Sequence, residues 1–464
     1  MIKLNDTIAA IATGMNQGGI GVIRVSGEKA ISIVDSIFVP KKKGKEVSNL
    51  STYTAAYGNI VEDKEKKDSV IDEVIVLVMK APASYTKEDV VEIDCHGGME
   101  IMKKILYLII KKGGRIAEPG EFTKRAFLNG RIDLSQAESV MDLISAKNEL
   151  AAKTALSQLK GSLKNKIMDL RNQLIHEVAF IESALDDPEH YSLDGFSEKL
   201  DDLLFNMEKE INHLIRMADD GKMLKEGIKT VILGKPNAGK SSVLNVMMGK
   251  DRAIVTDVAG TTRDTLEEFI SIRGIPLNII DTAGIRKTDD IVEKIGVDKS
   301  LKEIEDADLI LYIIDSSIKL DENDEKIIQM IKDKKVIILR NKSDLENIIT
   351  EDDIKNRLDK PVISISAKNK DGFDEFYDLL NQKFFHGNIN YNDEIYITNM
   401  RHKDALYDAL SSIKMVRQSI EDDMPEDFLS IDMMAAYERL GYIIGESVED
   451  DLVDTIFREF CMGK

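Results

Sequence analysis

The sequence predicts a multidomain chain: an N-terminal α+β domain, a central α-helical domain, and an α/β domain with a doubly wound, mostly parallel sheet inserted into the helical domain. Three observations support this architecture. The 464 residues are enough for about two to four domains, and 43% of them are hydrophobic. The spacing of apolar residues changes from short runs to a helical period, then to alternating strands and helices, and back. We therefore expect segments 1–120, 121–222, 223–384 and 385–464, with the second and fourth forming one helical domain.

The N-terminal segment alternates short apolar runs with glycines. Its strand-like runs are 6–13, 20–25, 74–79 and 90–94, and its helical patterns are 28–37 and 99–110. This mixed pattern predicts an α+β domain with a core of its own.

The second segment has an apolar stripe that repeats at steps of three and four residues: Leu159, Leu163, Ile167, Leu170, Leu174 and Val178. Such a stripe predicts core packing on one long helix. Pro188, within the polar run 186–189, disfavours continuation of that helix.

The third segment alternates strands and helices. Its buried-strand runs are 230–233, 277–280, 309–314, 336–339 and 362–365. The residues Arg-Gly-Ile-Pro at 273–276 can turn a hairpin between two strands. This pattern predicts a parallel sheet with crossover helices on both faces.

The charge is strongly acidic overall but unevenly spread. A net charge of −20 argues against indiscriminate binding to nucleic acid or anionic lipid. Residues 101–171, however, carry 14 Lys and Arg against 7 Asp and Glu, whereas residues 421–464 carry 13 acidic against 3 basic residues. The first of these segments is either a docking face for a polyanion or a solvated helical face, and charge counts alone favour the solvated face.

Two cysteines, Cys95 and Cys461, are too few for a disulfide framework, which indicates a reducing compartment. The first residues lack a signal-peptide pattern, and no run of 18 apolar residues occurs. We therefore expect a cytoplasmic protein without a membrane span.

Four motifs in the third segment stand in the order of a guanine-nucleotide switch: Gly-Lys-Pro-Asn-Ala-Gly-Lys-Ser at 234–241, Asp-Thr-Ala-Gly at 281–284, Asn-Lys-Ser-Asp at 341–344, and Ser-Ala-Lys at 366–368. In this order, the motifs are those that contact the phosphates, then the magnesium ion and γ-phosphate, then the edge of the base, and then the back of the base. The first motif follows a predicted strand and opens a predicted helix, which is the context that a phosphate loop requires.

The residue types fit this chemistry. Backbone N–H groups at the helix N-terminus can bind phosphate oxygens, Lys240 adds a cation, and the Ser241 hydroxyl can bind Mg²⁺. Asp281 can hold Mg²⁺ through water, and the Gly284 N–H can reach the γ-phosphate. Thr262, in Gly-Thr-Thr-Arg at 260–263, is the candidate for a second hydroxyl on Mg²⁺.

The third motif selects guanine. The Asp344 carboxylate can accept both the ring N–H and the exocyclic amine of guanine, and adenine would leave this acid unpaired. Ile285 stands where Ras-like GTPases place the glutamine that orients water. Another residue must therefore orient the water, and another positive charge must replace an arginine finger.

Motifs along the rest of the chain point to one family. They are Gly-Gly-Ile-Gly-Val-Ile-Arg-Val-Ser-Gly at 18–27, Pro-Gly-Glu-Phe at 119–122, Arg-Ala-Phe-Leu-Asn at 125–129, Gly-Thr-Thr-Arg-Asp at 260–264, and Cys-Met-Gly-Lys at 461–464, where Met replaces the usual Ile. On these motifs the chain resembles, over essentially its whole length, the MnmE (TrmE) family of tRNA-modification GTPases.

The resemblance implies a potassium-dependent P-loop GTPase whose G domains pair face to face. Potassium would be held by Asn237, Thr256, Val258 and Thr261, and Mg²⁺ by Ser241 and Thr262. The catalytic residues would be Glu293, which orients water, with Lys240 and Thr262. By position alone, Glu293 is an ordinary acid in the first turn of a helix.

The motifs and the resemblance together give the expected GTP-binding residues: Asn237, Ala238, Gly239, Lys240, Ser241, Ser242, Thr256, Asp257, Val258, Ala259, Gly260, Thr261, Thr262, Asp281, Thr282, Ala283, Gly284, Asn341, Lys342, Asp344, Ser366, Ala367 and Lys368.

The resemblance also implies that the N-terminal domain forms a homodimer and binds 5-formyltetrahydrofolate or a related tetrahydrofolate. The matching positions are Arg24, Glu92, Arg131 and Lys464, which without the family would be ordinary surface or paired charges. Cys461 could act in one-carbon chemistry or be a small packed side chain, and the sequence leaves both open.

The function implied is carried out with the flavoprotein MnmG, which holds FAD, in a heterotetramer. It adds an aminomethyl or carboxymethylaminomethyl group to carbon 5 of the wobble uridine of tRNA, with folate as one-carbon donor and glycine or ammonium as amine. Two alternatives are a ribosome-assembly switch, whose basic RNA-binding module is not found in the sequence, and a folate-dependent transferase with an unused G domain, against which the intact nucleotide motifs argue.

Overall fold

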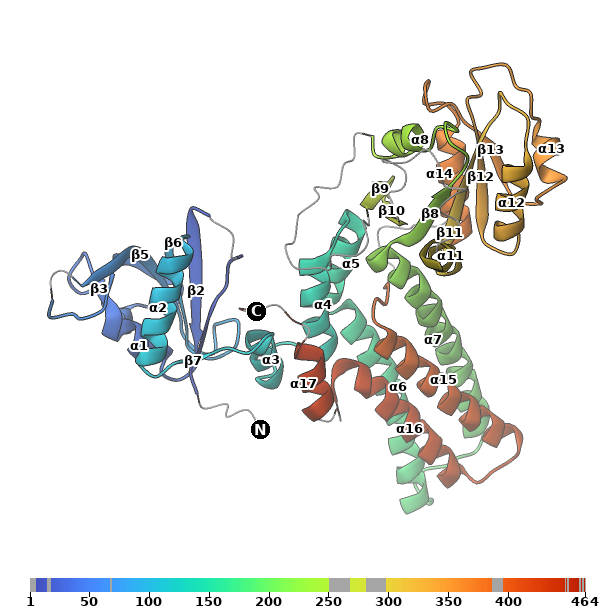
Figure 1. Cartoon of the computed structure of the whole chain (residues 1–464). Helices are drawn as coiled ribbons and strands as arrows, with labels where there is room; N and C mark the ends of the chain where they lie inside the picture. The colour runs from blue at the N-terminus through green and yellow to red at the C-terminus, as the bar shows by residue number, and fades with distance from the viewer. Residues whose placement is uncertain are drawn as a thin grey trace. The chain divides into compact units, whose positions relative to one another are not determined.

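The computed structural model describes residues 6–14, 18–66, 69–249, 268–280, 298–385, 395–446, 448, 450–458, 460 and 463. The chain forms two compact units, and Figure 1 labels the elements of both. Unit 1 is Met1–Met141, Gln158–Ala179 and Tyr437–Lys464, and unit 2 is Asp142–Ser157 and Phe180–Ala436.

Unit 1 contains a seven-stranded sheet in the order β3-β4-β5-β6-β2-β1-β7 among its described residues. The strands are β1 (Ile8–Ile11), β2 (Ile20–Ser26), β3 (Phe38–Pro40), β4 (Thr54–Val61), β5 (Val70–Met79), β6 (Val90–His96) and β7 (Arg115–Ile116). The pairing is antiparallel throughout, except that β7 runs parallel to β1. All four predicted strands are present with shifted ends, whereas β3, β4 and β7 were not predicted.

One face of this sheet is covered by α1 (Ala30–Ile37) and α2 (Met99–Lys111), near the short helix η1 (Val47–Asn49). Ile23 and Ile93 point toward these helices and are fully buried. Because side chains alternate along a strand, Arg24 and Glu92 stand on the opposite face, directly across from each other in the β2–β6 register.

Unit 1 also contains α3 (Glu121–Leu128) and α17 (Asp450–Arg458), while α4 (Leu134–Ser145), α6 (Ser162–Asp186) and α16 (Glu426–Ile444) have residues in both units. Arg125 of α3 is 1% exposed and pairs with Asp6 (2.5 Å), Glu121 (3.0 Å) and Glu88 (3.1 Å). Arg115 completes this cluster at 2.6 Å from Glu121. These pairs tie α3 to Asp6, shortly before β1, and to Glu88, shortly before β6.

The predicted apolar stripe is divided between two helices. Helix α5 (Glu149–Leu159) ends at Leu159, and Gly161 adopts a left-handed φ of +93° before α6 begins. Glycine adopts this conformation readily, and it ends a helix. The other five stripe residues lie on α6 and are buried, and α6 ends at Asp186, shortly before Pro188.

Unit 2 holds an α/β sheet in the order β13-β12-β11-β8-β10-β9. Its strands are β8 (Ile228–Leu233), β9 (Glu268–Ile272), β10 (Ile275–Ile280), β11 (Leu309–Asp315), β12 (Val336–Asn341) and β13 (Val362–Ser364). All pairs are parallel except the β9–β10 hairpin. Arg273 and Gly274 form its turn with φ of +48° and +86°, as a type I′ turn requires.

Helices cover both faces of this sheet. One apolar core includes α8 (Lys240–Met247) and α14 (Phe373–Phe385), and the other includes residues of α11 (Asp298–Glu305), α12 (Glu322–Ile331) and α13 (Glu351–Lys355). The sequence prediction of a doubly wound, mostly parallel sheet is therefore confirmed. The carboxyl ends of β8, β11 and β12 lie at one edge, which is where such sheets bind ligands.

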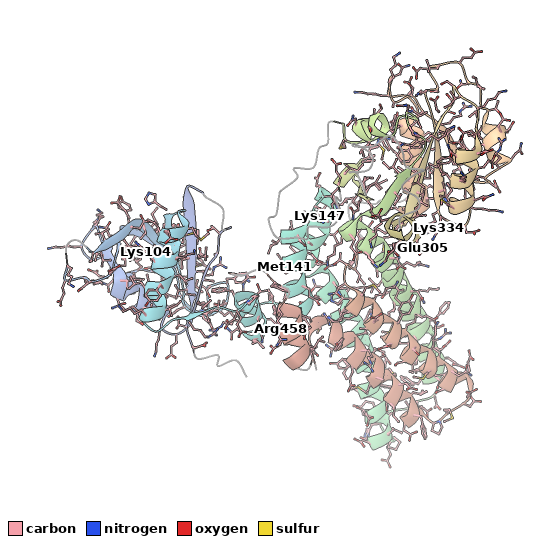
Figure 2. The ribbon with its side chains drawn as sticks, in the orientation of Figure 1. Lys104, Met141, Lys147, Glu305, Lys334 and Arg458 are labelled. Carbon is pink, nitrogen blue, oxygen red and sulfur yellow. The ribbon has the colours of Figure 1, made fainter. Side chains whose placement is uncertain are left out.

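The helical part of unit 2 is built on α7 (Phe196–Glu226) and α15 (Met400–Glu421), which pack side by side. The ammonium of Lys147, labelled in Figure 2, lies 3.5 Å from the centre of the Phe269 ring on β9. The Asn148 side chain donates to the Leu224 carbonyl at 3.0 Å, so the start of α5 is tied to the end of α7. Within the described residues, no helix has both the length and the apolarity needed to cross a membrane.

Candidate functional site

The phosphate loop connects β8 to α8 at the carboxyl edge of the unit 2 sheet. Asn237 and Gly239 adopt left-handed φ angles of +60° and +95°. A side chain at Gly239 would place its Cβ 2.2 Å from Nδ2 of Asn341, so this position needs glycine. Lys240 donates from Nζ to the carbonyls of Gly234 and Lys235, both at 2.8 Å. The loop is therefore folded tightly around the lysine that is expected to bind phosphate.

The side chains that could bind a nucleotide and its metal ion are accessible to solvent. Asn237, Ser241 and Ser242 are exposed, whereas Ala238 is buried beneath them. None of the described residues forms a hydrogen bond with the Asn237 side chain. An exposed serine in the first turn of α8 and an exposed amide in the loop fit the hard cations Mg²⁺ and K⁺, which prefer oxygen ligands.

Asn341 joins the phosphate loop to the base-binding loops. It is 2% exposed, and its Nδ2 donates to the Ala238 carbonyl at 2.9 Å. Its Oδ1 accepts from the Ala367 N–H at 3.1 Å. One side chain thus connects three of the four motifs that the sequence identified.

Asp344 is positioned by Ser366, whose hydroxyl donates to Oδ1 at 2.7 Å. This hydrogen bond lowers the pKa of Asp344, so the carboxylate is ionised and can accept from guanine. Lys368, which is exposed, lies 3.9 Å from the other oxygen of Asp344. The base-recognition residues predicted from the sequence therefore come together in the structure.

Sequence reasoning missed Asp315, at the end of β11. Its Oδ2 lies 2.5 Å from Nζ of Lys342, and its Oδ1 accepts from the Ser317 hydroxyl at 2.6 Å. Partial burial would raise the pKa of Asp315, but Lys342 and Ser317 hold it below its usual value. A carboxylate directly after the buried run Leu-Ile-Leu-Tyr-Ile-Ile was the signal that could have indicated it.

Several predicted site residues lie outside the described residues. They are Thr256, Asp257, Val258, Ala259, Gly260, Thr261, Thr262, Asp281, Thr282, Ala283, Gly284, Glu293, Cys461 and Lys464.

A second group of predicted residues comes together in unit 1. Arg24 and Glu92 form an ion pair at 2.7 Å, with side chains 19% and 20% exposed. The Arg24 guanidinium lies 5.6 Å, and the Arg131 guanidinium 4.6 Å, from the centre of the Tyr85 ring. Arg24 also donates to the Gly463 carbonyl at 3.5 Å. Two of the four residues expected to bind folate therefore lie against one tyrosine that the sequence did not single out, and a third, Glu92, is paired with one of them.

Cys95 belongs to the core of unit 1 and not to this group. It is 4% exposed, and its thiol donates to the Gly21 carbonyl at 3.3 Å. Burial, with Asp72 nearby, raises the pKa of Cys95 to about 11. This thiol is structural and unreactive.

Comparison with known proteins agrees with this architecture. Residues 7–131 match the family model described as GTP-binding protein TrmE N-terminus, and residues 134–461 match the model described as MnmE helical domain. Among solved structures, the G domain of the T. maritima FeoB iron transporter is 26% identical and covers 34% of this chain and 96% of its own, but its TM-score of 0.25 is too low to establish a shared fold.

Similar curated proteins extend over nearly the whole chain. The tRNA modification GTPase MnmE of Lachnoclostridium phytofermentans is 57% identical over 459 residues, which is 99% of both chains. The protein of the same name from Clostridioides difficile is 49% identical over 466 residues, covering 99% of this chain and all of its own. With both family models also matched, the chain belongs to the MnmE (TrmE) family of tRNA modification GTPases.

Proposed function

We propose that this tRNA modification GTPase depends on potassium and acts with the flavoprotein MnmG on the wobble uridine of tRNA. The product would carry an aminomethyl or carboxymethylaminomethyl group on carbon 5, with a tetrahydrofolate as one-carbon donor. The observation that carries the GTPase part is the junction at Asn341, which holds the phosphate loop and both base loops together. The segments 1–120, 121–222, 223–384 and 385–464 remain our proposed domain boundaries.

For hydrolysis, Lys240 would bind the phosphates, Ser241 and Thr262 would bind Mg²⁺, and Glu293 would orient the attacking water. Potassium, held by Asn237, Thr256, Val258 and Thr261, would supply the positive charge that an arginine finger supplies elsewhere. The exposed Asn237 amide supports this assignment, since it is available to a ligand.

The test is GTP turnover in potassium against sodium, in the full-length protein. We expect strong stimulation by potassium in the wild type and its loss in Asn237→Ala, with binding of GDP retained. Glu293→Ala should abolish turnover and tRNA modification, whereas Glu346→Ala, an exposed acid of the same unit, should change neither. Equal rates in both salts would refute the potassium dependence.

For folate, we propose that Glu92 accepts from the amino edge of the pterin and that Arg24, Arg131 and Lys464 bind the carboxylates of the glutamate tail. The contacts of Arg24 and Arg131 with Tyr85, and the ion pair between Arg24 and Glu92, support a shared site. Arg131→Met should weaken binding of 5-formyltetrahydrofolate, measured by calorimetry. Lys104→Met, an exposed lysine on α2 (Figure 2), is the matched control and should bind as the wild type does.

For assembly, we propose a cytoplasmic homodimer that binds MnmG as a heterotetramer. The sheet face of unit 1 opposite α1 and α2 carries exposed apolar side chains, namely Ile20 (69%), Tyr57 (53%) and Ile75 (45%). Tyr57 and Ile75 face each other across β4 and β5. Exposed apolar groups in one patch are typical of a protein interface, and a second copy of the chain is the partner that the family implies.

A further inference from the structure

One lysine of the phosphate loop, Lys235, is half-buried in an ion-pair cluster with two acids of another helix. Nζ of Lys235 lies 2.6 Å from Asp324 and 3.0 Å from Asp321, and its side chain is 11% exposed. Both acids belong to the start of α12, where Asp321 is the N-cap and Asp324 the third helical residue. The loop is therefore bonded to a helix far along the chain.

The two carboxylates are themselves held in place. Asp321 accepts from the N–H groups of Asn323 (2.9 Å) and Asp324 (3.3 Å), and Asp324 accepts from the Asp321 N–H at 3.0 Å, which completes a capping box. The hydroxyl of Tyr312, which is fully buried on β11, donates to Asp324 at 2.8 Å. The anchor for Lys235 is thus part of the sheet and helix core.

The backbone of Lys235 supports the lysine that is expected to bind phosphate. Its carbonyl accepts from Nζ of Lys240 at 2.8 Å and from the Ala238 N–H at 3.3 Å. On the other side of the loop, the Ala238 carbonyl accepts from Asn341. The loop is therefore fixed at two points, by an ion pair at Lys235 and by a side-chain amide at Asn341.

We propose that Lys235 is a positioning residue for GTP: its ion pair with Asp321 and Asp324 clamps the phosphate loop onto α12 and holds Lys240 and the loop N–H groups in their binding arrangement. A preformed loop binds its ligand without first losing conformational freedom. This inference depends only on GTP binding, and not on the potassium, folate or MnmG proposals.

The charge of Lys235 is maintained by its partners. Burial would lower the pKa of Lys235, but Asp324 and Asp321 raise it above its usual value. A neutral side chain at this position would leave Asp324, which is 1% exposed, without its cation. Since a buried charge that loses its partner is unfavourable, the loop and the start of α12 should rearrange together.

The first test compares Lys235→Met with Lys235→Arg. Because the clamp acts equally before and during hydrolysis, Lys235→Met should raise the KM for GTP and the Kd for GDP by about tenfold or more, with kcat within about threefold. Lys235→Arg, which keeps the charge, should restore both constants to within about threefold of wild type. Lys229→Met removes an exposed lysine from the preceding strand and should leave them unchanged.

The second test is a double-mutant cycle with Asp324→Asn, which preserves the shape of the side chain and an acceptor for Tyr312. If the two residues act as a pair, the double variant should bind GDP no more weakly than the weaker single variant. If the increases in Kd caused by the two substitutions multiply in the double variant, the clamp is overturned. It is also overturned if Lys235→Met leaves KM and Kd unchanged, even when that variant yields a smaller folded fraction.

Discussion

Asn341→Ala is the substitution whose effect on the nucleotide site can be worked out most fully. It removes one bond to the Ala238 carbonyl and one from the Ala367 N–H, at 2.9 and 3.1 Å. Asn341 and Ala238 are each 2% exposed, so water cannot easily replace the lost donor. Both bonds join parts of the protein itself, so their loss should appear as reduced stability of the protein.

The size of the effect follows from the burial of each partner. Leaving the buried Ala238 carbonyl unpaired costs about 1–3 kcal/mol, and losing the bond to the half-buried Ala367 N–H costs about 0.5–1.5 kcal/mol, because water can reach it. The sum is about 1.5–4.5 kcal/mol of unfolding free energy. For a folding unit of this size, that corresponds to a decrease of roughly 3–18 °C in melting temperature.

The assay is thermal unfolding of the full chain followed by fluorescence, with and without saturating GDP. Hydrogen exchange of peptides containing Ala238 and Ala367 then locates the change. Asn356→Ala removes an exposed asparagine at the end of α13 and should melt as the wild type does. If Asn341→Ala melts within about 1 °C of this control and both peptides exchange normally, the junction does not stabilise the site.

Three further predictions follow from the rest of the molecule. Cys95, with a pKa of about 11, should resist alkylation by iodoacetamide at pH 8 in the native protein and react fully in urea, as peptide mass spectrometry can show; rapid native labelling would contradict its burial. Burial would raise the pKa values of Asp6 and Glu121, but Arg115 and Arg125 hold both below normal. The two carboxylates should therefore stabilise unit 1 at pH values above their unfolded-state pKa values of 3.8 and 4.5. This stability should be lost as the pH falls through their lower folded-state pKa values. Urea midpoints between pH 2 and 6 test this, and Arg125→Met should flatten the profile. Ile75→Asp should convert the proposed dimer to monomers in analytical ultracentrifugation, whereas Tyr107→Asp, at an exposed position on α2, should not; a dimer that survives Ile75→Asp does not use this face.

The elements that the sequence predicted well are those with a strong local signal. The strands of the α/β sheet are nearly continuous apolar runs, because helices bury both of their faces. Strand β4 has a weaker pattern, Thr-Ala-Ala-Tyr-Gly-Asn-Ile-Val, and it is defined by pairing with β5. Strand β7 has two residues and exists through its bonds to β1, which no local pattern reports.

The same distinction applies to the candidate site. Asn341, Asp344 and Ser366 were predicted because motif order alone identifies them, and the structure places them together. The bond from Lys342 to Asp315 and the clamp at Lys235 could not be predicted, since each joins side chains from elements that approach only in the folded sheet. Tyr85 could not be predicted for the same reason, because its ring contacts Arg24 and Arg131 only in the folded domain.

The division of unit 1 into three separate stretches of sequence has a consequence for biosynthesis. Residues 142–436 are translated between its first and last stretches, and only Gln158–Ala179 of these belong to it. At typical ribosomal speeds of about 5–20 residues per second, this delay is roughly 15–60 s. During that time Ala126 and Leu134 cannot pack against Val453 and Phe457, with which they form one apolar cluster in the folded protein. The nascent chain thus exposes an unfinished hydrophobic surface while the nucleotide-binding unit is being translated, and it is at this stage that a chaperone would be needed.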